Sequence, residues 1–388
     1  MPTLQQIFRC NYHTLAESRT LPPHFHRAAH QLTRCRTAAL GGHIQACPSG
    51  HIERVWYNSC RHRSCPQCNR IQIDHWLERQ RARLLGCAHH HLIFTLPHDL
   101  NPLWMLNSAH LMQHLFHTVR DVLMELLADP KYLGAEPGFL LALHTWGRSL
   151  SLHPHIHCLI TDGGLFDEQW RSPRGSCFLP ARVVMAKFRG KFLASLRRAI
   201  LQGKLKLPHG ISLERACSLL NRLGRKKWNV RLCERYTHGE GVVRYLARYV
   251  RGGPLHNSQL TAADDKQVTY RYFAHADGGT QLRHMTLEPD AFMRRYLQHV
   301  PEPGRHTVRA YGLYAQRKTA ALNQARAQFQ QAPVAAAEPL TWQHYWQRLH
   351  PQAGVHRCPV CGVQLVHGRT IQPVRGPPPR PQRAPVHA

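Results

Sequence analysis

The middle of the chain alternates short apolar runs, typical of β-strands, with longer stretches whose apolar residues recur every three or four positions, typical of amphipathic helices. The strand-like runs lie at residues 89–96, 139–146, 155–161, 228–233, 268–273 and 282–287. The helix-like stretches lie at residues 103–127, 181–201, 213–223, 241–250 and 290–300. This mixed order predicts an α+β fold in which helices cover an antiparallel sheet.

Two pairs of these predicted strands are expected to be neighbours. Residues 139–146 and 155–161 are joined by a short polar link at 147–152, which favours an antiparallel pair. Residues 268–273 and 282–287 flank Asp277-Gly278-Gly279, a turn signal that favours a hairpin.

The two ends of the chain differ from this middle region. Residues 1–86 are rich in Cys, His and Arg. Beyond about residue 330 the chain is rich in Ala, Gln and Pro, and it ends in a basic Pro-rich segment. Such a segment has too few apolar residues to bury a core, so we expect it to add nothing to the packed part of the protein.

The charge of the chain narrows the class of partner. There are 51 Lys and Arg against 22 Asp and Glu, a formal charge of +29. This excess favours a polyanion, most often nucleic acid; an ordinary basic soluble protein is the alternative. No apolar run reaches the ~18 residues of a membrane-spanning helix, and the first 19 residues lack the pattern of a signal peptide. We therefore expect no membrane partner and a place in the cytoplasm, at the nucleoid.

A dense group of potential metal ligands lies in the N-terminal zone. It comprises Cys47, His51, Cys60, Cys65 and Cys68. In a reducing compartment cysteines bind metals or fill cores, and two close pairs of soft ligands roughly 15 residues apart match tetrahedral zinc. Cys47, His51, Cys65 and Cys68 would make one complete set, with Cys60 as a competing ligand. Cys35, His43 and His62 are candidates for a second site.

The residues around these ligands are basic. Arg61, Arg63 and Arg70 favour contact between this module and DNA phosphates, and a purely structural zinc is the alternative. Near the other end of the chain, Cys358 and Cys361 form a further Cys-x-x-Cys pair, with His356 and His367 nearby. One such pair is a weak signal: it is either part of a small zinc knuckle or without a role.

The sharpest chemical feature is a His-x-His pair in the strand-like run at 155–161. Residues i and i+2 of a strand point to the same face, so His155 and His157 would project together, with Ile156 turned into the core. Two imidazoles at this separation are able to share one divalent ion, which is able to polarise a phosphodiester. Two incidental histidines are the alternative. His153 precedes a proline and is expected to face away from the pair.

A second feature lies in the helix-like stretch at 241–250. Tyr245 and Tyr249 are four residues apart and would share one helix face, interleaved with Arg244, Arg248 and Arg251, which we expect to bind DNA. A tyrosine hydroxyl held in line with the leaving oxygen attacks phosphorus when the phosphate charge is neutralised. Ordinary helix packing is the alternative.

These features together resemble the rolling-circle insertion-sequence transposases, the two-tyrosine branch of the HUH endonuclease superfamily. The matching stretches are residues 35–43, 58–68, 91–100, 143–165, 244–250 and 292–315. The resemblance implies an HUH nuclease-like domain at residues 87–320, preceded by a zinc- and DNA-binding domain at 1–86. A helical and then Pro-rich tail at 321–388, which contains the second Cys-x-x-Cys pair, would follow.

The resemblance also implies a mechanism. His155 and His157 would bind Mg²⁺ or Mn²⁺ at the scissile phosphate of single-stranded DNA from the ends of a mobile element. One of Tyr245 and Tyr249 would attack, leaving a 5′-phosphotyrosine and a free 3′-OH, and the other would make a second cut or accept the returning strand. The third metal ligand stays open between His144, on the preceding strand, and Glu240; we favour His144. Oligomers are possible.

Two other functions fit the same motifs. A plasmid relaxase or replication initiator uses this chemistry, although the chain lacks a P-loop signature and its zinc module suits a transposase better. A catalytically inactive zinc-dependent DNA-binding protein is the alternative from another class.

Overall fold

The centre of the molecule is a five-stranded antiparallel sheet with the strand order β12-β4-β5-β3-β8. Its strands are β3 (His89–Thr95), β4 (Gly138–Trp146), β5 (Leu152–Thr161), β8 (Val230–Tyr236) and β12 (Val308–Gly312). This computed structural model describes residues 1–173, 178–241, 243, 253–276, 279–336, 341 and 356–374. The predicted pairing of the strands around residues 139–146 and 155–161 is confirmed, and β5 begins three residues earlier than predicted.

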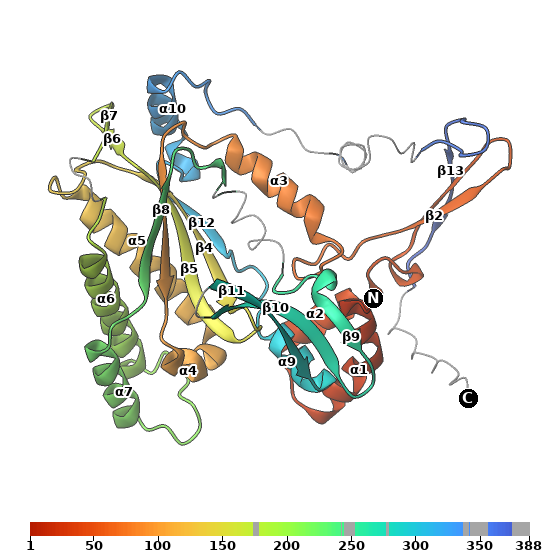
Figure 1. The fold of residues 1–388 in the computed structure, drawn as a ribbon, viewed down its shortest axis with the longest axis horizontal. Helices are drawn as coiled ribbons and strands as arrows, with labels where there is room; N and C mark the ends of the chain where they lie inside the picture. Colours follow the sequence, from red (N-terminus) through yellow and green to blue (C-terminus); the bar gives the residue numbers. More distant parts are fainter. Residues whose placement is uncertain are drawn as a thin grey trace.

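Helices cover both faces of this sheet (Figure 1). One face packs against α4 (Asn101–Leu106), α5 (Ser108–Ala128), α6 (Ala181–Leu201) and α7 (Leu213–Arg225). The other face shares a core with α3 (Asn69–Arg81) and α10 (Thr319–Gln328). The predicted α+β class, with an antiparallel sheet between helices, is therefore confirmed. None of the described helices is both long and apolar enough to span a bilayer.

Strand periodicity decides which side chains reach which face. In β5, Ile156 and Cys158 are fully buried in the core beneath α5 and α6. Successive residues of a strand alternate between faces, so His155 and His157 point to the opposite side. The sheet thus separates an apolar face, which holds the fold, from a face that carries histidines.

The helix predicted at 103–127 is interrupted, and the prediction of one continuous helix was wrong. Asn107 lies between α4 and α5, outside helical backbone geometry. Its side-chain amide bonds the carbonyls of Leu103 and Lys206 and the backbone N–H of Lys206, at 2.8 to 3.0 Å. An asparagine side chain that binds backbone groups competes with the helical hydrogen bonds, which explains the break. The helix predicted at 181–201 has the predicted bounds.

A second core joins the N-terminal helices to elements from much later in the chain. It contains α1 (Leu4–Ser18), α2 (Pro23–Arg34), α9 (Pro289–Leu297) and the sheet of β9 (Leu260–Ala263), β10 (Val268–Ala276) and β11 (Gly279–Leu287). The predicted hairpin of β10 and β11 is confirmed, with longer strands than predicted. Segments before and after residue 86 therefore pack together in one core.

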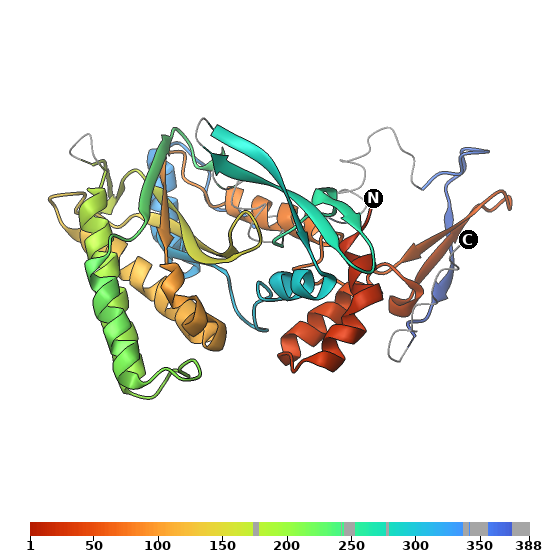
Figure 2. The same cartoon turned by 60° about the horizontal axis from the view of Figure 1, so that its bottom comes forward.

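A third, small sheet stands apart from the other two in Figures 1 and 2. It consists of β1 (Gly42–Ala46), β2 (Glu53–Tyr57) and β13 (Val366–Ile371), in the order β13-β1-β2. The shortest elements are β6 (Gly164–Phe166), β7 (Gln169–Arg171) and the 3-10 helices η1 (Ala38–Leu40), η2 (His98–Leu100), η3 (Asn257–Gln259) and η4 (Gln316–Lys318).

A buried histidine between the first two cores makes stability depend on pH. His299 donates from Nε2 to the carbonyl of Leu150 at 3.0 Å, and its Nδ1 accepts from the hydroxyl of Thr145 at 3.1 Å. Burial lowers the pKa of His299 to about 4, and burial likewise lowers the pKa of His89 to about 4. Both side chains are therefore neutral in the folded protein at neutral pH.

We predict that the free energy of unfolding is largest above pH 6.5 and falls as the pH is lowered from 6.5 toward 4. In that range the unfolded chain binds protons that the folded His299 and His89 do not, so acid favours unfolding. Urea denaturation at several pH values measures how steeply the free energy of unfolding depends on pH. The variant His299→Phe should have a shallower slope than the parent chain, and stability that rises as the pH falls through this window would contradict the prediction.

Candidate active site and zinc clusters

Three histidines meet on the face of the sheet opposite the main core. His155 and His157 come from β5, and His144 of β4 lies directly across the strand pair from His155. Their ligand nitrogens all lie within 4.8 Å of one another, and the Nε2 atoms of His155 and His157 are 3.1 Å apart. The strand periodicity that predicted the His155 and His157 pair also places His144 beside it, whereas Glu240 forms an ion pair with Arg81 at 2.9 Å.

These three imidazoles are held in the neutral form. Burial, reinforced by the neighbouring histidines, lowers the pKa of His157 to about 2 and that of His144 well below its usual value. Burial lowers the pKa of His155 to about 4. A metal binds the lone pair of a neutral imidazole, so the cluster presents ligands without first losing protons at neutral pH.

The hydrogen bonds around the cluster orient the rings. His155 Nδ1 lies 2.6 Å from the carbonyl oxygen of His153, so Nδ1 carries the proton and Nε2 keeps its lone pair. His157 Nδ1 lies 2.9 Å from Nε2 of His91, a buried residue of β3. If Nε2 of His91 accepts a hydrogen bond from the protonated Nδ1 of His157, then Nε2 of His157 is unprotonated and its lone pair is directed at the cluster. Sequence reasoning missed His91, although its place two residues into a strand-like run was a usable signal.

One expectation about this strand was wrong. His153 does not face away from the pair: its ring lies 5.1 Å from that of His155, and its Nδ1 bonds His98 Nε2 at 2.7 Å. Strand β5 runs through Pro154, where its pairing with β4 is irregular, and the ring of His153 still lies on the side of His155. Among the described residues, His153 is nevertheless not a member of the three-histidine group.

The donor set suits a divalent metal ion. Adjacent ligands of an octahedral ion lie about 3 Å apart at metal–ligand distances near 2.1 Å, close to the separation of the His155 and His157 nitrogens. Three nitrogen donors from two strands leave the remaining positions of such an ion open for oxygen ligands. The residues present therefore fit a divalent ion that has positions left for oxygen ligands.

A cavity of about 880 Å³ lies at the edge of β4; its lining includes none of the three histidines and approaches them through Trp146. Its wall includes Trp146, whose ring stacks on that of His144 at 5.3 Å between centroids. The lining combines a second tryptophan, Trp104, with the basic residues Arg63, Arg294, Arg295 and Arg305. Aromatic rings and positive charges in one cavity are the two features that bind single-stranded nucleic acid.

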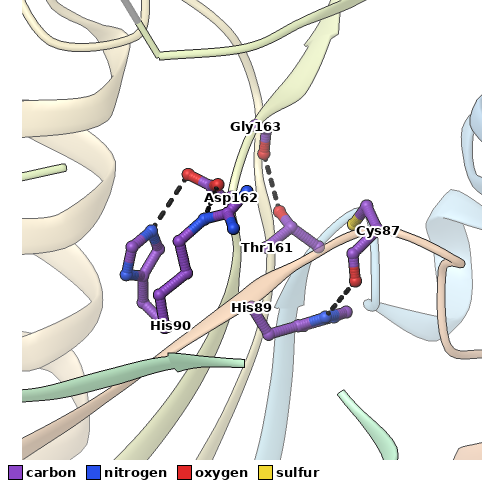
Figure 3. A network of polar contacts seen from close by, with 7 residues as sticks. Cys87, His89, His90, Thr161, Asp162 and Gly163 are labelled. Atoms are coloured by element: carbon purple, nitrogen blue, oxygen red, sulfur yellow. Dashed lines mark hydrogen bonds and ion pairs between the residues drawn. The ribbon is translucent and has the colours of Figure 1, made fainter. Parts of the chain in front are cut away.

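A polar network joins residues of β3, β5 and β8 at one end of the sheet (Figure 3). His90 and Arg235 both pair with Asp162, at 2.9 and 2.5 Å, and His89 bonds the carbonyl of Cys87 at 2.9 Å. Gly239 then passes so close to His89 that a Cβ there would lie 2.9 Å from the ring. The network thus anchors β8 and the turn that follows it to the sheet.

The start of the tyrosine segment packs on the histidine-bearing face. Val243 is fully buried in the same core as Ala142, which pairs with His157 across β4 and β5. Tyr245 follows Val243 by two residues in the sequence. The remaining predicted residues of this segment, Tyr245, Tyr249, Arg244, Arg248 and Arg251, lie outside the described residues.

Four cysteines meet at the junction of α2, β2 and α3. Cys35 ends α2, Cys60 follows β2, and Cys65 and Cys68 precede α3. The sulfur of Cys35 lies 3.1 Å from that of Cys68 and 3.6 Å from that of Cys65. Tetrahedral zinc with Zn–S distances of about 2.3 Å would set neighbouring sulfurs about 3.8 Å apart, so a small expansion admits the ion. Hydrogen bonds from the other thiols, first that of Cys35, lower the pKa of Cys68.

The predicted single ligand set of Cys47, His51, Cys65 and Cys68 is therefore wrong. Cys65 and Cys68 lie with Cys35 and Cys60, whereas Cys47 and His51 lie with Cys358 and Cys361. The hairpin of β1 and β2 separates the two pairs that are adjacent in sequence. Among the described residues, His43 and His62 belong to neither group of four.

The three arginines predicted to bind DNA near the zinc ligands have different surroundings. Arg61 is exposed, and its carbonyl accepts a hydrogen bond from Gln72. Arg63 lines the large cavity and donates to Thr307 and to the carbonyl of Arg305. Arg70 lies in α3, and its side chain is outside the described part of the structure.

Comparison with known proteins identifies the family of the chain. Residues 138–321 match the family model described as "Putative transposase", and residues 7–96 match that described as "Transposase zinc-binding domain". The four-cysteine cluster lies wholly within the second match, which supports a structural zinc there. No solved structure matches the chain.

Two relatives cover most of the chain. The protein named "Putative transposase y4qJ" from Sinorhizobium fredii is 34% identical over 355 residues, which is 89% of each chain. The protein named "Transposase for insertion sequence element IS801" from Pseudomonas savastanoi pv. phaseolicola is 31% identical over 299 residues, 74% of this chain and 69% of the relative. The chain belongs to the insertion-sequence transposase family that includes these two proteins.

Proposed function

We propose that this transposase nicks single-stranded DNA at the ends of its element through a tyrosine nucleophile and a divalent ion. The observation that carries the proposal is the cluster of His144, His155 and His157 on the sheet face where Val243, two residues before Tyr245, is buried. The comparisons favour a transposase over the relaxase and the inactive DNA-binding protein that also fit the motifs.

His144, His155 and His157 would hold Mg²⁺ or Mn²⁺. A bound ion of this kind supplies Lewis-acid stabilisation of the charge that develops on a phosphodiester. The protein's own part is to keep three imidazoles neutral and aimed, through burial and through the hydrogen bonds to His153 and His91.

Tyr245 or Tyr249 would supply the nucleophile. Its oxygen forms a bond to phosphorus, the bond from phosphorus to the 3′-oxygen breaks, and that oxygen takes up a proton as the tyrosine hydroxyl loses one. The products are a 5′-phosphotyrosine and a free 3′-OH, and the ester retains the bond energy for rejoining, so no ATP is required. The other tyrosine would then cut a second strand or accept the returning one.

The cavity at the edge of β4, which approaches the histidines through Trp146, is the proposed path of the DNA strand. Trp146, which is partly exposed, offers a ring face for stacking against a base, while Arg63, Arg294 and Arg305 offer charge to the backbone. Arg61 and Arg70 of the zinc module, and Arg244, Arg248 and Arg251 beside the tyrosines, would add further phosphate contacts.

We predict that His91→Phe lowers the affinity of the histidine cluster for Mn²⁺ by about 10- to 100-fold, because Phe keeps the ring volume but removes the acceptor for His157. Isothermal titration calorimetry measures the affinity. His90→Ala is the matched control, since its side chain lies on the other face of β3 and pairs with Asp162. Equal Mn²⁺ affinity in the parent chain and in His91→Phe would contradict the assignment.

Removal of zinc is expected to unfold the N-terminal module and to weaken DNA binding. Cys65 and Cys68 lie in the same core as Phe8 and Tyr296, so the loss of a shared metal exposes apolar residues of α1 and α9. Circular dichroism and DNA binding, recorded before and after chelation and again after zinc is restored, measure the effect. Unchanged signals after chelation would argue against a structural zinc.

The proposed function is tested by incubating the protein with labelled single strands from the ends of its own element. We expect cleavage that requires Mg²⁺ or Mn²⁺, and little cleavage of the same sequence as a duplex. Equal cleavage of duplex and single-stranded DNA would contradict the proposed substrate.

A further inference from the structure

Two turns of the same kind, from opposite ends of the chain, face each other beside the small sheet. The first is Cys47-Pro48-Ser49-Gly50-His51 and the second is Cys358-Pro359-Val360-Cys361-Gly362. In the first turn the Gly50 N–H bonds the carbonyl of Cys47 at 2.9 Å, and in the second the Gly362 N–H bonds that of Cys358 at 2.9 Å. Each turn contains a glycine with φ near +75°, at Gly50 and Gly362, and presents two potential metal ligands.

The four ligand atoms converge on one point. Cys47, His51, Cys358 and Cys361 have ligand atoms that all lie within 4.8 Å of one another. The Cys47 sulfur is 3.5 Å from Nδ1 of His51 and 3.5 Å from the sulfur of Cys361. Tetrahedral zinc, with Zn–N near 2.0 Å and Zn–S near 2.3 Å, sets such neighbouring ligands about 3.5 to 3.8 Å apart. The arrangement therefore has the dimensions of a zinc site.

The sheet beside these turns has too little core to be stable alone. Among the described residues, the apolar cluster between the turns consists of Cys47, Cys358 and Leu365, with Ile52 packed against them, and Ile44 of β1 is the one further buried apolar side chain of the three strands. Large apolar side chains such as Val55 and Val366 are about half exposed instead. Small folds of this type need a metal or a disulfide in place of a core, and the thiols of this group are free.

The backbone pairing of the strands also joins the C-terminal part of the chain to the N-terminal part. Strand β13 pairs antiparallel with β1, with Gly42 opposite Ile371 and Ala46 opposite Val366. Arg34, at the end of α2, donates to the carbonyl of Val374 at 2.7 Å. The C-terminal strand is thus a member of the N-terminal sheet, although Cys47 and Cys361 are 314 positions apart.

We propose that Cys47, His51, Cys358 and Cys361 bind a second zinc ion, which fastens the C-terminal strand β13 to the β1–β2 hairpin. Three thiolates and one imidazole form a ligand set that selects zinc over harder ions such as Mg²⁺. A metal that joins residues so far apart closes a long loop, and such closures restrict the unfolded chain strongly. The zinc module of this transposase is thereby completed by residues beyond the region that matches the zinc-binding family model.

The test is the zinc content of the purified full chain, measured by plasma mass spectrometry. We expect two zinc ions per chain in the parent protein and one in each of two double variants, Cys358→Ser with Cys361→Ser, and Cys47→Ser with His51→Ala. Cys217→Ser with Cys233→Ser is the matched control, because those thiols lie outside both groups, and it should retain two.

Hydrogen exchange of the same variants distinguishes a local loss of structure in the small sheet from unfolding of the whole protein. We expect faster exchange in β1 and β13 of both ligand variants, and unchanged exchange in the five-stranded sheet. Two zinc ions in the Cys358→Ser, Cys361→Ser variant would overturn the proposal. The proposal would also be overturned if the parent chain bound only one zinc ion and the Cys358→Ser, Cys361→Ser variant still bound one.

Discussion

His155→Ala is expected to abolish DNA cleavage while leaving DNA binding largely intact. The substitution removes one of three neutral imidazoles that converge on the proposed ion, and the loss of a Lewis acid removes several kcal/mol of transition-state stabilisation. We therefore expect the single-turnover rate to fall by about 10³-fold or more. The affinity for DNA should change little, because most of that affinity comes from the basic surface of a chain with a formal charge of +29.

The matched control for this variant is His153→Ala. The His153 side chain adjoins the His155 ring, but it is outside the three-histidine group, and its carbonyl, which orients His155, remains after substitution. Cleavage by His153→Ala should stay within a few-fold of the parent chain. Cleavage by His155→Ala at the parent rate would show that the histidine cluster does not hold the catalytic ion.

The double substitution Tyr245→Phe and Tyr249→Phe is expected to eliminate both cleavage and covalent attachment to DNA. Phenylalanine keeps the ring and removes only the hydroxyl, so the nucleophile is lost while packing is retained. A fall of about 10³-fold or more in the cleavage rate is expected. Each single variant should show which tyrosine makes the first cut. The measurement is cleavage of labelled end DNA on a denaturing gel.

Tyr236→Phe is the control for this pair. Tyr236 ends β8, packs beside the core that contains Val243, and lies nine positions before Tyr245 in the sequence, so its substitution perturbs the same region without removing a proposed nucleophile. The Tyr236→Phe variant should cleave the labelled end DNA at the rate of the parent chain. If the double variant still cleaved DNA, water rather than tyrosine would be the attacking group.

The histidine cluster was predictable because it depends on local geometry. A period of two along a strand places His155 and His157 on one face, and a short link between two strands places His144 opposite His155. Both relations hold between residues close together in the sequence. The same reasoning failed at His153, which precedes a proline and was expected to face away from the pair, and at Asn107, whose side chain ends a helix through backbone contacts with Lys206.

The zinc ligand sets were not predictable in the same way, because they depend on contacts between distant segments. Spacing shows that Cys65 and Cys68 form a pair, but not that Cys35, brought in by α2, completes their site. Nor does spacing show that Cys358 returns to Cys47 across most of the chain. Only the packing of α2 and the pairing of β13 with β1 determine these partners.

The tyrosine mechanism is tested most directly by a search for a covalent protein–DNA complex. The parent chain is incubated with 5′- or 3′-labelled single-stranded end DNA, with Mn²⁺ or Mg²⁺ and in their absence, and resolved on a denaturing gel before mass spectrometry of the linked peptide. We predict a metal-dependent adduct in which the 5′-phosphate of the downstream strand is joined to Tyr245 or Tyr249. Metal-dependent cleavage with no adduct, or an adduct on any other residue, would contradict the proposed tyrosine mechanism.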